Sequence, residues 1–310
     1  MLLEAKKPMA DQPGSTPVAR TRDATAPISV LIPTLNEERN IADCLASVDF
    51  AAERIVYDSF SSDRTLDIAR EAGARIEQRK FDVFSRHKNW ALDNLSFAHE
   101  WILILDADER IPPALEAEIR AVVANPTADA YYLPRQNFFA GRWIKHCGMY
   151  PDWQLRLFKR GSARYEDRIV HEHMLTTRTT SRLKNPIRHD DYKGLERYID
   201  RHNTYSTMEA IAVYHELSGN SGNALEASFL RPGPHRRRAL KNFAYRHLPF
   251  RPAIVFFYMY IFRGGILDGR TGFDYSVLRA TYEFQIDLKL RELDNPKSSM
   301  RARYNELMSR

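Results

Sequence analysis

Strand and helix patterns alternate along the first third of the chain, and this alternation limits the possible folds more than any other feature. Apolar runs typical of strands occupy residues 28–32, 54–57, 74–77 and 101–105. Amphipathic helical patterns lie between and after them. Asn36 is predicted to cap the first helix, and Pro112 and Pro113 to open the last. Strands that alternate with helices form a largely parallel sheet, which predicts an α/β protein.

Polar residues gather where three of these strands end. The three clusters are Thr34–Glu37, Asp58–Asp63 and Asp106–Glu109. Ligands of parallel α/β sheets bind beyond the carboxyl ends of the strands, so the clusters are predicted to share one binding edge. The first strand is followed by PTLNEE rather than GxGxxG, which disfavours a dinucleotide-binding protein.

Two carboxylates, Asp106 and Asp108, stand one residue apart after the strand at 101–105. Alternate residues of a strand share a face, and two like charges there repel unless a cation separates them. A turn or a helix cap explains the spacing equally well. The position on the binding edge favours a hard divalent cation, Mg²⁺ or Mn²⁺, completed by phosphate oxygens of a substrate. Asp58 is open to two interpretations, an Asx turn or a contact with a nucleotide.

The composition indicates which partners and which cellular compartment are expected for the protein. The 310 residues are 44% hydrophobic, with a formal net charge of +6, which favours anionic partners such as nucleotides, nucleic acid or an anionic membrane. Two cysteines, Cys44 and Cys147, are too few for a disulfide scaffold and favour a reducing, cytosolic setting. The first 26 residues contain no apolar secretory core and are predicted to be a flexible tail, and no apolar run reaches 18 residues.

After residue 130 the strand and helix patterns no longer alternate regularly. A hairpin is predicted around Gly141, a strand over 153–161, and helices from about residue 191. The basic segment 235–247 (HRRRALKNFAYRH) precedes the aromatic segment 249–262 (PFRPAIVFFYMYIF). These segments are either helices packed on the catalytic part with solvated arginines or a patch that contacts anionic lipid, and the second interpretation is favoured.

Four motifs in order carry a resemblance to a known family: IPTLNEERNIADCLASV, VYDSFSSDRTLDIAREAGARI, FSRHKNWALDN and LILDADERI. Over about residues 28–190 the chain resembles the family 2 nucleotide-diphospho-sugar transferases, which have the GT-A fold. Later segments are similar to bacterial lipopolysaccharide core glycosyltransferases of the β-1,4-glucosyltransferase-like group. The resemblance implies a tail (1–26), a GT-A catalytic domain with a Rossmann-like mixed sheet (27–190) and a helical carboxyl-terminal region (191–310).

The resemblance also implies an activity and a site. The expected reaction is inverting, divalent-metal-dependent transfer of a sugar from a nucleotide-sugar, by family habit a UDP-sugar, to a saccharide or lipid-linked acceptor of a cell-envelope glycan. Asp108 is the expected main ligand of Mg²⁺ or Mn²⁺, with Asp106 beside it. In place of the small residue that the family often has after its Asp-Ser pair, this chain has Phe60. The expected donor-binding residues are Pro33, Thr34, Glu37, Asp58, Ser59, Asp63, Lys88, Asn89 and Asp106.

An inverting transfer needs a general base near the acceptor hydroxyl. The candidate carboxylates are Asp152, Glu166, Asp167 and Glu172. Glu172, in the sequence VHEH, best matches the family's acidic motif and is the predicted base, although a solvated carboxylate at a strand end is the alternative. His173 is a candidate additional metal ligand, against the alternative of a structural histidine.

Two rival functions are open to the sequence. A nucleic-acid-binding protein would use Arg236–Arg238 and the neighbouring aromatic residues, although nucleic acid is the less favoured partner. A phosphatase with an aspartate nucleophile is disfavoured because two strand–helix units precede Asp106. The expected location is cytoplasmic, peripheral on the inner face of the cytoplasmic membrane.

Overall fold

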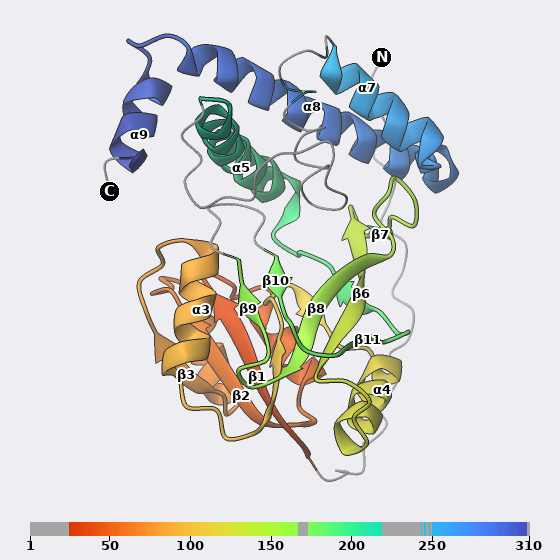
Figure 1. Ribbon diagram of the computed structural model, residues 1–310. Helices are drawn as coiled ribbons and strands as arrows, with labels where there is room; N and C mark the ends of the chain where they lie inside the picture. The colour runs from red at the N-terminus through yellow and green to blue at the C-terminus, as the bar shows by residue number, and fades with distance from the viewer. Residues whose placement is uncertain are drawn as a thin grey trace, which may run out of the picture.

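The computed structural model describes residues 25–166, 173–218, 243, 245, 248 and 250–308. Its centre is a mixed ten-stranded sheet in the order β3-β2-β1-β4-β8-β6-β12-β5, with β7 and β11 also paired to β6 (Figure 1). A small second sheet pairs β9 with β10. The strands are β1 (Ala26–Thr34), β2 (Ala51–Asp58), β3 (Arg75–Gln78), β4 (Trp101–Ile104), β5 (Glu109–Arg110), β6 (Ala130–Phe139), β7 (Arg142–Trp143), β8 (Asp152–Lys159), β9 (Arg164–Tyr165), β10 (Met174–Leu175), β11 (Thr180–Arg182) and β12 (Ile187–His189).

The first four strands pair in parallel, as the alternating pattern predicts. Buried aliphatic residues of β1 face both sides of the sheet, so β1 is the central strand of the core. The helices between the strands are α1 (Ile41–Ser47), α2 (Thr65–Glu71), α3 (Phe84–Asn94) and α4 (Pro113–Ala124). Strand β8 runs antiparallel to both β4 and β6, so β6 points the same way as β1 and β4. The α/β prediction is confirmed.

Local predictions agree with the structure at most points and fail at Asn36. The N-cap residue of α1 is Asn40, four residues later than predicted. Asn36 has a left-handed backbone with φ 55°, and its side-chain oxygen accepts a hydrogen bond from the backbone N–H of Ser62 at 2.8 Å. Asn36 therefore joins two loops rather than starting a helix. The hairpin around Gly141 is confirmed, with Phe139 opposite Arg142.

Helices form a layer beyond the carboxyl ends of β1, β4 and β6 (Figure 1). They are α5 (Gly194–Leu217), α7 (Arg251–Phe257), the π-helical turn η1 (Tyr258–Phe262), the 3₁₀ turn η2 (Gly265–Asp268), α8 (Gly269–Leu293) and α9 (Ser299–Met308). Ala210 and Ile211 of α5 pack against Tyr282 and Ile286 of α8 in a separate buried cluster. Most of the basic segment 235–247 lies outside the described residues. None of the described helices is both long and apolar enough to cross a membrane.

Candidate active site

Parallel pairing brings the three polar clusters to one edge of the sheet. Thr34, the last residue of β1, lies opposite Asp58, the last residue of β2. On the other side of β1, the pairing of Leu31 with Ile104 places the Asp106–Glu109 cluster next to Thr34. We call this edge, formed by the carboxyl ends of β1, β2 and β4, the carboxyl edge. The prediction that the three clusters share one edge is confirmed, and ligand binding at this edge stays a prediction.

Asp58 holds the loop that follows β2. Its carboxylate accepts hydrogen bonds from the Thr34 hydroxyl at 2.9 Å, and from the backbone N–H and hydroxyl of Ser61 at 2.8 and 2.5 Å. Gln78 donates a fourth bond at 3.3 Å. The Asp58 side chain is fully buried. These contacts form the turn that the sequence allowed, while the contact of Asp58 with a nucleotide stays a prediction.

Phe60 occupies the position where the family often has a small residue. Its backbone is left-handed, with φ 63°, a conformation that glycine adopts without strain and that bulky residues rarely adopt. The ring is exposed. The loop thus keeps a glycine-like turn, and the larger side chain points an aromatic surface away from the core.

Asp106 lies between two cationic side chains. Its carboxylate accepts a hydrogen bond from Arg156 on β8 at 2.5 Å and lies 3.7 Å from the Lys88 ammonium on α3. Burial alone would raise the pKa of Asp106, but Arg156 and Lys88 outweigh it and hold that pKa well below its ordinary range. Arg156 also donates to the fully buried Glu109 at 2.9 Å. The charge of Asp106 is therefore fixed by contacts far apart in sequence.

Asp108 faces a different set of cations. Its carboxylate lies 3.3 Å from Nε2 of His189 and 4.0 Å from Arg201 on α5. Burial raises the pKa of Asp108, but the charge and hydrogen bond of His189, together with Arg201, outweigh burial and lower the pKa to about 2. Nδ1 of His189 lies 2.9 Å from Oδ1 of Asn137, which fixes the ring so that Nε2 faces Asp108.

His189 is a site residue that sequence reasoning missed. It ends β12, which lies between β6 and β5, so His189 stands opposite both Asn137 and Glu109. The sequence IRHDD at 187–191 has the pattern of a strand end followed by acidic residues, as in the other edge clusters, and this pattern could have marked His189 as a candidate. Only the strand order shows that His189 lies next to the Asp106–Glu109 cluster. Among the described residues no group of three or more His, Cys, Asp and Glu side chains is placed to hold a metal ion.

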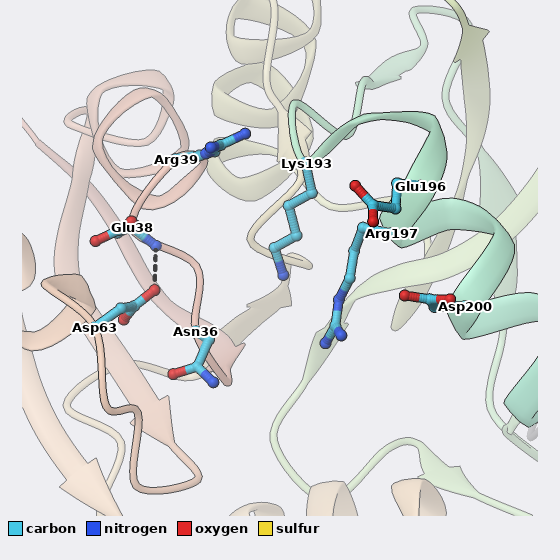
Figure 2. A pocket seen from close by; sticks show the side chains of 8 residues that line it. All are labelled: Asn36, Glu38, Arg39, Asp63, Lys193, Glu196, Arg197 and Asp200. Atoms are coloured by element: carbon cyan, nitrogen blue, oxygen red, sulfur yellow. Dashed lines mark hydrogen bonds between the residues drawn. The ribbon is translucent and has the colours of Figure 1, made fainter.

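A cavity of about 350 Å³ lies between the loop after β1 and the start of α5. Figure 2 shows Lys193 and Arg197 on one side of it and Glu38 and Asp63 on the other. Asp63 accepts hydrogen bonds from the backbone N–H groups of Glu38 and Thr65, which holds the loops after β1 and β2 together. The cavity therefore has walls of both charges.

Glu37 links this cavity to the carboxyl edge. The Lys193 ammonium donates to its carboxylate at 2.5 Å, and Asn40 donates at 2.9 Å. Burial raises the pKa of Glu37, although these two donors oppose the shift. Asn40 also binds Asp191, so the start of the helical layer is fastened to the loop after β1.

The other predicted donor residues differ in what they contact. Pro33 is half-buried in β1. The Ser59 hydroxyl lies 3.2 Å from His87 of α3. The side-chain amide of Asn89 binds the backbone N–H and carbonyl of Tyr165, both at 2.9 Å, so Asn89 holds β9 in place. The donor roles of these residues stay predictions.

Only some of the residues predicted to act on the acceptor lie within the part of the chain that the structure describes. Glu172, the predicted base, and Asp167 lie outside the described residues. His173 is exposed just before β10, and its role as a metal ligand stays a prediction. Asp152 accepts hydrogen bonds from Arg135 at 2.7 and 3.0 Å and from Gln154 at 2.8 Å. Because both of its oxygens are engaged, Asp152 is better suited to positioning than to proton transfer.

His87 predicts a specific loss of stability in acid. Burial and the nearby Arg79 lower its pKa to about 4, whereas a histidine in an unfolded chain titrates near ~6.5. The unfolded state therefore binds a proton that the folded state does not, and the free energy of unfolding falls as the pH drops from ~6.5 toward ~4, by up to ~1.4 kcal/mol per pH unit. Urea unfolding across this pH window should show a shallower pH dependence for His87→Gln than for the wild type. Equal pH dependence for the two proteins would contradict a lowered pKa of His87 in the folded state.

Comparison with known proteins identifies the family. The family model of glycosyl transferase family 2 matches residues 29–184, half of the chain. The chain therefore belongs to glycosyl transferase family 2, which makes it a glycosyltransferase with a GT-A-type fold. The resemblance inferred from the four motifs is confirmed, and the phosphatase alternative is excluded.

Individual relatives give the extent of the similarity. The chain is 26% identical over 288 residues to the lipopolysaccharide core biosynthesis glycosyltransferase LpsC of Rhizobium meliloti (strain 1021), covering 90% of this chain and 96% of LpsC. It is 35% identical over 108 residues to an uncharacterized glycosyltransferase of Rickettsia bellii (strain RML369-C), covering 34% of this chain and 36% of the relative. A solved structure, the mannosyltransferase PcManGT from Pyrobaculum calidifontis in complex with GDP-Man and Mn²⁺, is similar with a TM-score of 0.46 and 17% identity, covering 89% of this chain and 90% of that one.

Proposed function

We propose that this glycosyltransferase moves a sugar from a nucleotide-sugar donor, by family habit a UDP-sugar, to a saccharide or lipid-linked acceptor of a lipopolysaccharide-core-like glycan, with inversion and with a divalent cation. The observation that carries the proposal is the placement of Asp106 and Asp108 on the carboxyl edge, with His189 facing Asp108. The near full-length similarity to LpsC supports the class of acceptor.

The residues around Asp108 suit Mg²⁺ or Mn²⁺. Carboxylate oxygens are the preferred ligands of these hard cations, which take few protein ligands and are completed by water and by phosphate oxygens of a substrate. Oδ2 of Asp108 and Nε2 of His189 are 3.3 Å apart. Burial lowers the pKa of His189, but the charge and hydrogen bond of Asp108 outweigh burial and raise it, so the imidazolium already places positive charge beside this carboxylate. Asp108 would hold the cation, with Asp106 beside it. When bound, the cation supplies positive charge that stabilises the diphosphate leaving group.

The protein side chains perform the remaining tasks. Asn137 holds His189 with Nε2 toward Asp108, so the pair is oriented before any ligand arrives. Arg156 and Lys88 keep Asp106 ionised and fix its direction. Lys193, which is paired with Glu37, and Arg197 line the cavity beside the edge together with acidic side chains. Glu172 stays the predicted base for the acceptor hydroxyl.

A donor panel tests this function and its metal requirement. The purified chain is incubated with UDP-, GDP- and ADP-sugars and Mn²⁺ or Mg²⁺, and thermal stability and donor hydrolysis are recorded. One donor with metal should raise the melting temperature and be hydrolysed slowly, and EDTA should remove both effects because the carboxylates then have no cation to share with the diphosphate. Unchanged melting with every donor, together with stabilisation by oligonucleotides, would favour the nucleic-acid-binding alternative and contradict the proposal.

A further inference from the structure

Exposed apolar side chains cover one side of the helical layer. We define the apolar face by residues of α7, η1 and η2, namely Ile254, Phe257, Ile261, Phe262, Ile266 and Leu267, all of which are exposed. Ile254, Phe257 and Ile261 recur at helical spacing along α7 and η1, so these three share a side of the helix. Phe262 and Leu267 at its end are 79% and 73% exposed. Exposed apolar side chains that gather on neighbouring turns are typical of an interaction site.

The helices that carry this face are firmly held. Cys147 donates a backbone hydrogen bond to the Arg263 carbonyl at 3.0 Å, and the His146 backbone N–H donates to the Asp268 carboxylate at 2.8 Å. Met259 is buried against Ile144 and Cys147. Arg251, at the start of α7, binds Glu283 and Asp287 of α8 at 2.5 Å. The apolar face is therefore a fixed feature of the fold, built on the segment 139–151 and on α8.

The segments that form and hold the apolar face carry an excess of cations. Arg142 and Lys145 of the segment 139–151, and Arg263 and Arg270 of the helical segments, are exposed. Within 139–151 and 250–273, the only acidic residue is Asp268, which is 6% exposed and bonded to His146. Asp274, one turn further along α8, lies 3.5 Å from Arg270. Aromatic and aliphatic side chains that share a surface with an excess of cations suit the surface of an anionic bilayer.

From this arrangement we propose that the face of α7, η1 and η2 binds the surface of an anionic phospholipid bilayer. A second copy of the chain is a poorer occupant, because a two-fold contact places the same patch against itself and would bring together more cations than acids. The face lies at the carboxyl end of β6, where Tyr275 of α8 packs on Phe139. Docking there would place the carboxyl edge near the membrane, where a lipid-linked acceptor would lie.

Vesicle sedimentation of the full chain tests the proposal without donor or metal, so its outcome is independent of the transfer reaction. Wild type should bind vesicles of phosphatidylethanolamine and phosphatidylglycerol, and bind them less in high salt or when only phosphatidylcholine is present. Phe262→Ser/Leu267→Ser should lower the partition coefficient by at least ~10-fold because two apolar side chains no longer enter the interface. Arg142→Gln/Lys145→Gln should lower it by roughly 5-fold per charge.

The matched control is Leu175→Ser/Leu195→Ser, which alters two exposed leucines, 55% and 54% exposed, away from the apolar face. It should bind vesicles like the wild type. Melting temperatures should be equal for all variants, since every altered side chain is exposed. Equal vesicle binding by the Phe262/Leu267 variant and the wild type would overturn the proposal. A second result would also overturn it: the wild type does not bind vesicles and is a dimer in analytical ultracentrifugation, and Phe262→Ser/Leu267→Ser is a monomer.

Discussion

Asp108→Ala is expected to lower metal-dependent turnover of the nucleotide-sugar by ~10²–10³-fold while the chain stays folded. The substitution removes the carboxylate that faces His189 on the carboxyl edge, and with it the proposed anchor of the cation. Loss of one preorganised electrostatic contact to a transition state typically costs ~10²–10³-fold in rate. Steady-state donor turnover at saturating Mn²⁺ measures the effect, with circular dichroism and thermal melting to verify folding.

Asp67→Ala is the matched control for this experiment. Asp67 lies on α2, exposed, and its contact with Arg70 is a surface pair of the kind that contributes little to stability. The control should turn over donor at the wild-type rate. If Asp108→Ala also reaches the wild-type rate, with the same dependence on Mn²⁺, then the cation is not held by Asp108 and the proposed site is wrong.

Arg156→Met is expected to destabilise the protein strongly, because it breaks a buried ionic network. Arg156 is 6% exposed and donates hydrogen bonds to Asp106 and to the fully buried Glu109. Methionine fills much of the volume but leaves both carboxylates without this cation. Removing one partner of a buried ionic network typically costs ~3–5 kcal/mol. The free energy of unfolding from urea titration measures the loss.

Arg164→Met provides the contrast. Arg164 pairs with Asp93 through two hydrogen bonds of 2.7 and 2.9 Å, but both side chains are largely exposed. Exposed pairs contribute ~0–1 kcal/mol, so this variant should unfold near the wild-type urea concentration. A loss below ~1 kcal/mol for Arg156→Met would mean that Glu109 and Asp106 are satisfied without Arg156.

The sequence alone determined the first four strands and the edge where their polar clusters meet. Apolar runs of four to five residues, separated by amphipathic helices, favour parallel pairing, and β1, β2, β3 and β4 form where those runs lie. Parallel pairing then forces Thr34, Asp58 and Asp106 to one side. These conclusions follow from local pattern because periodicity identifies each strand and helix, and a helix that connects two strands of one sheet lets the second strand run in the same direction as the first.

Tertiary structure alone decided which charges meet. Arg156 reaches Asp106 because β8 pairs with β4, and His189 reaches Asp108 because β12 inserts between β6 and β5. Neither the strand order nor the register of these pairs leaves a signal in local sequence, since each depends on packing between segments 50 or more residues apart. The same holds for Asn36, whose local preference for a helix cap loses to hydrogen bonds with Ser61 and Ser62 in another loop.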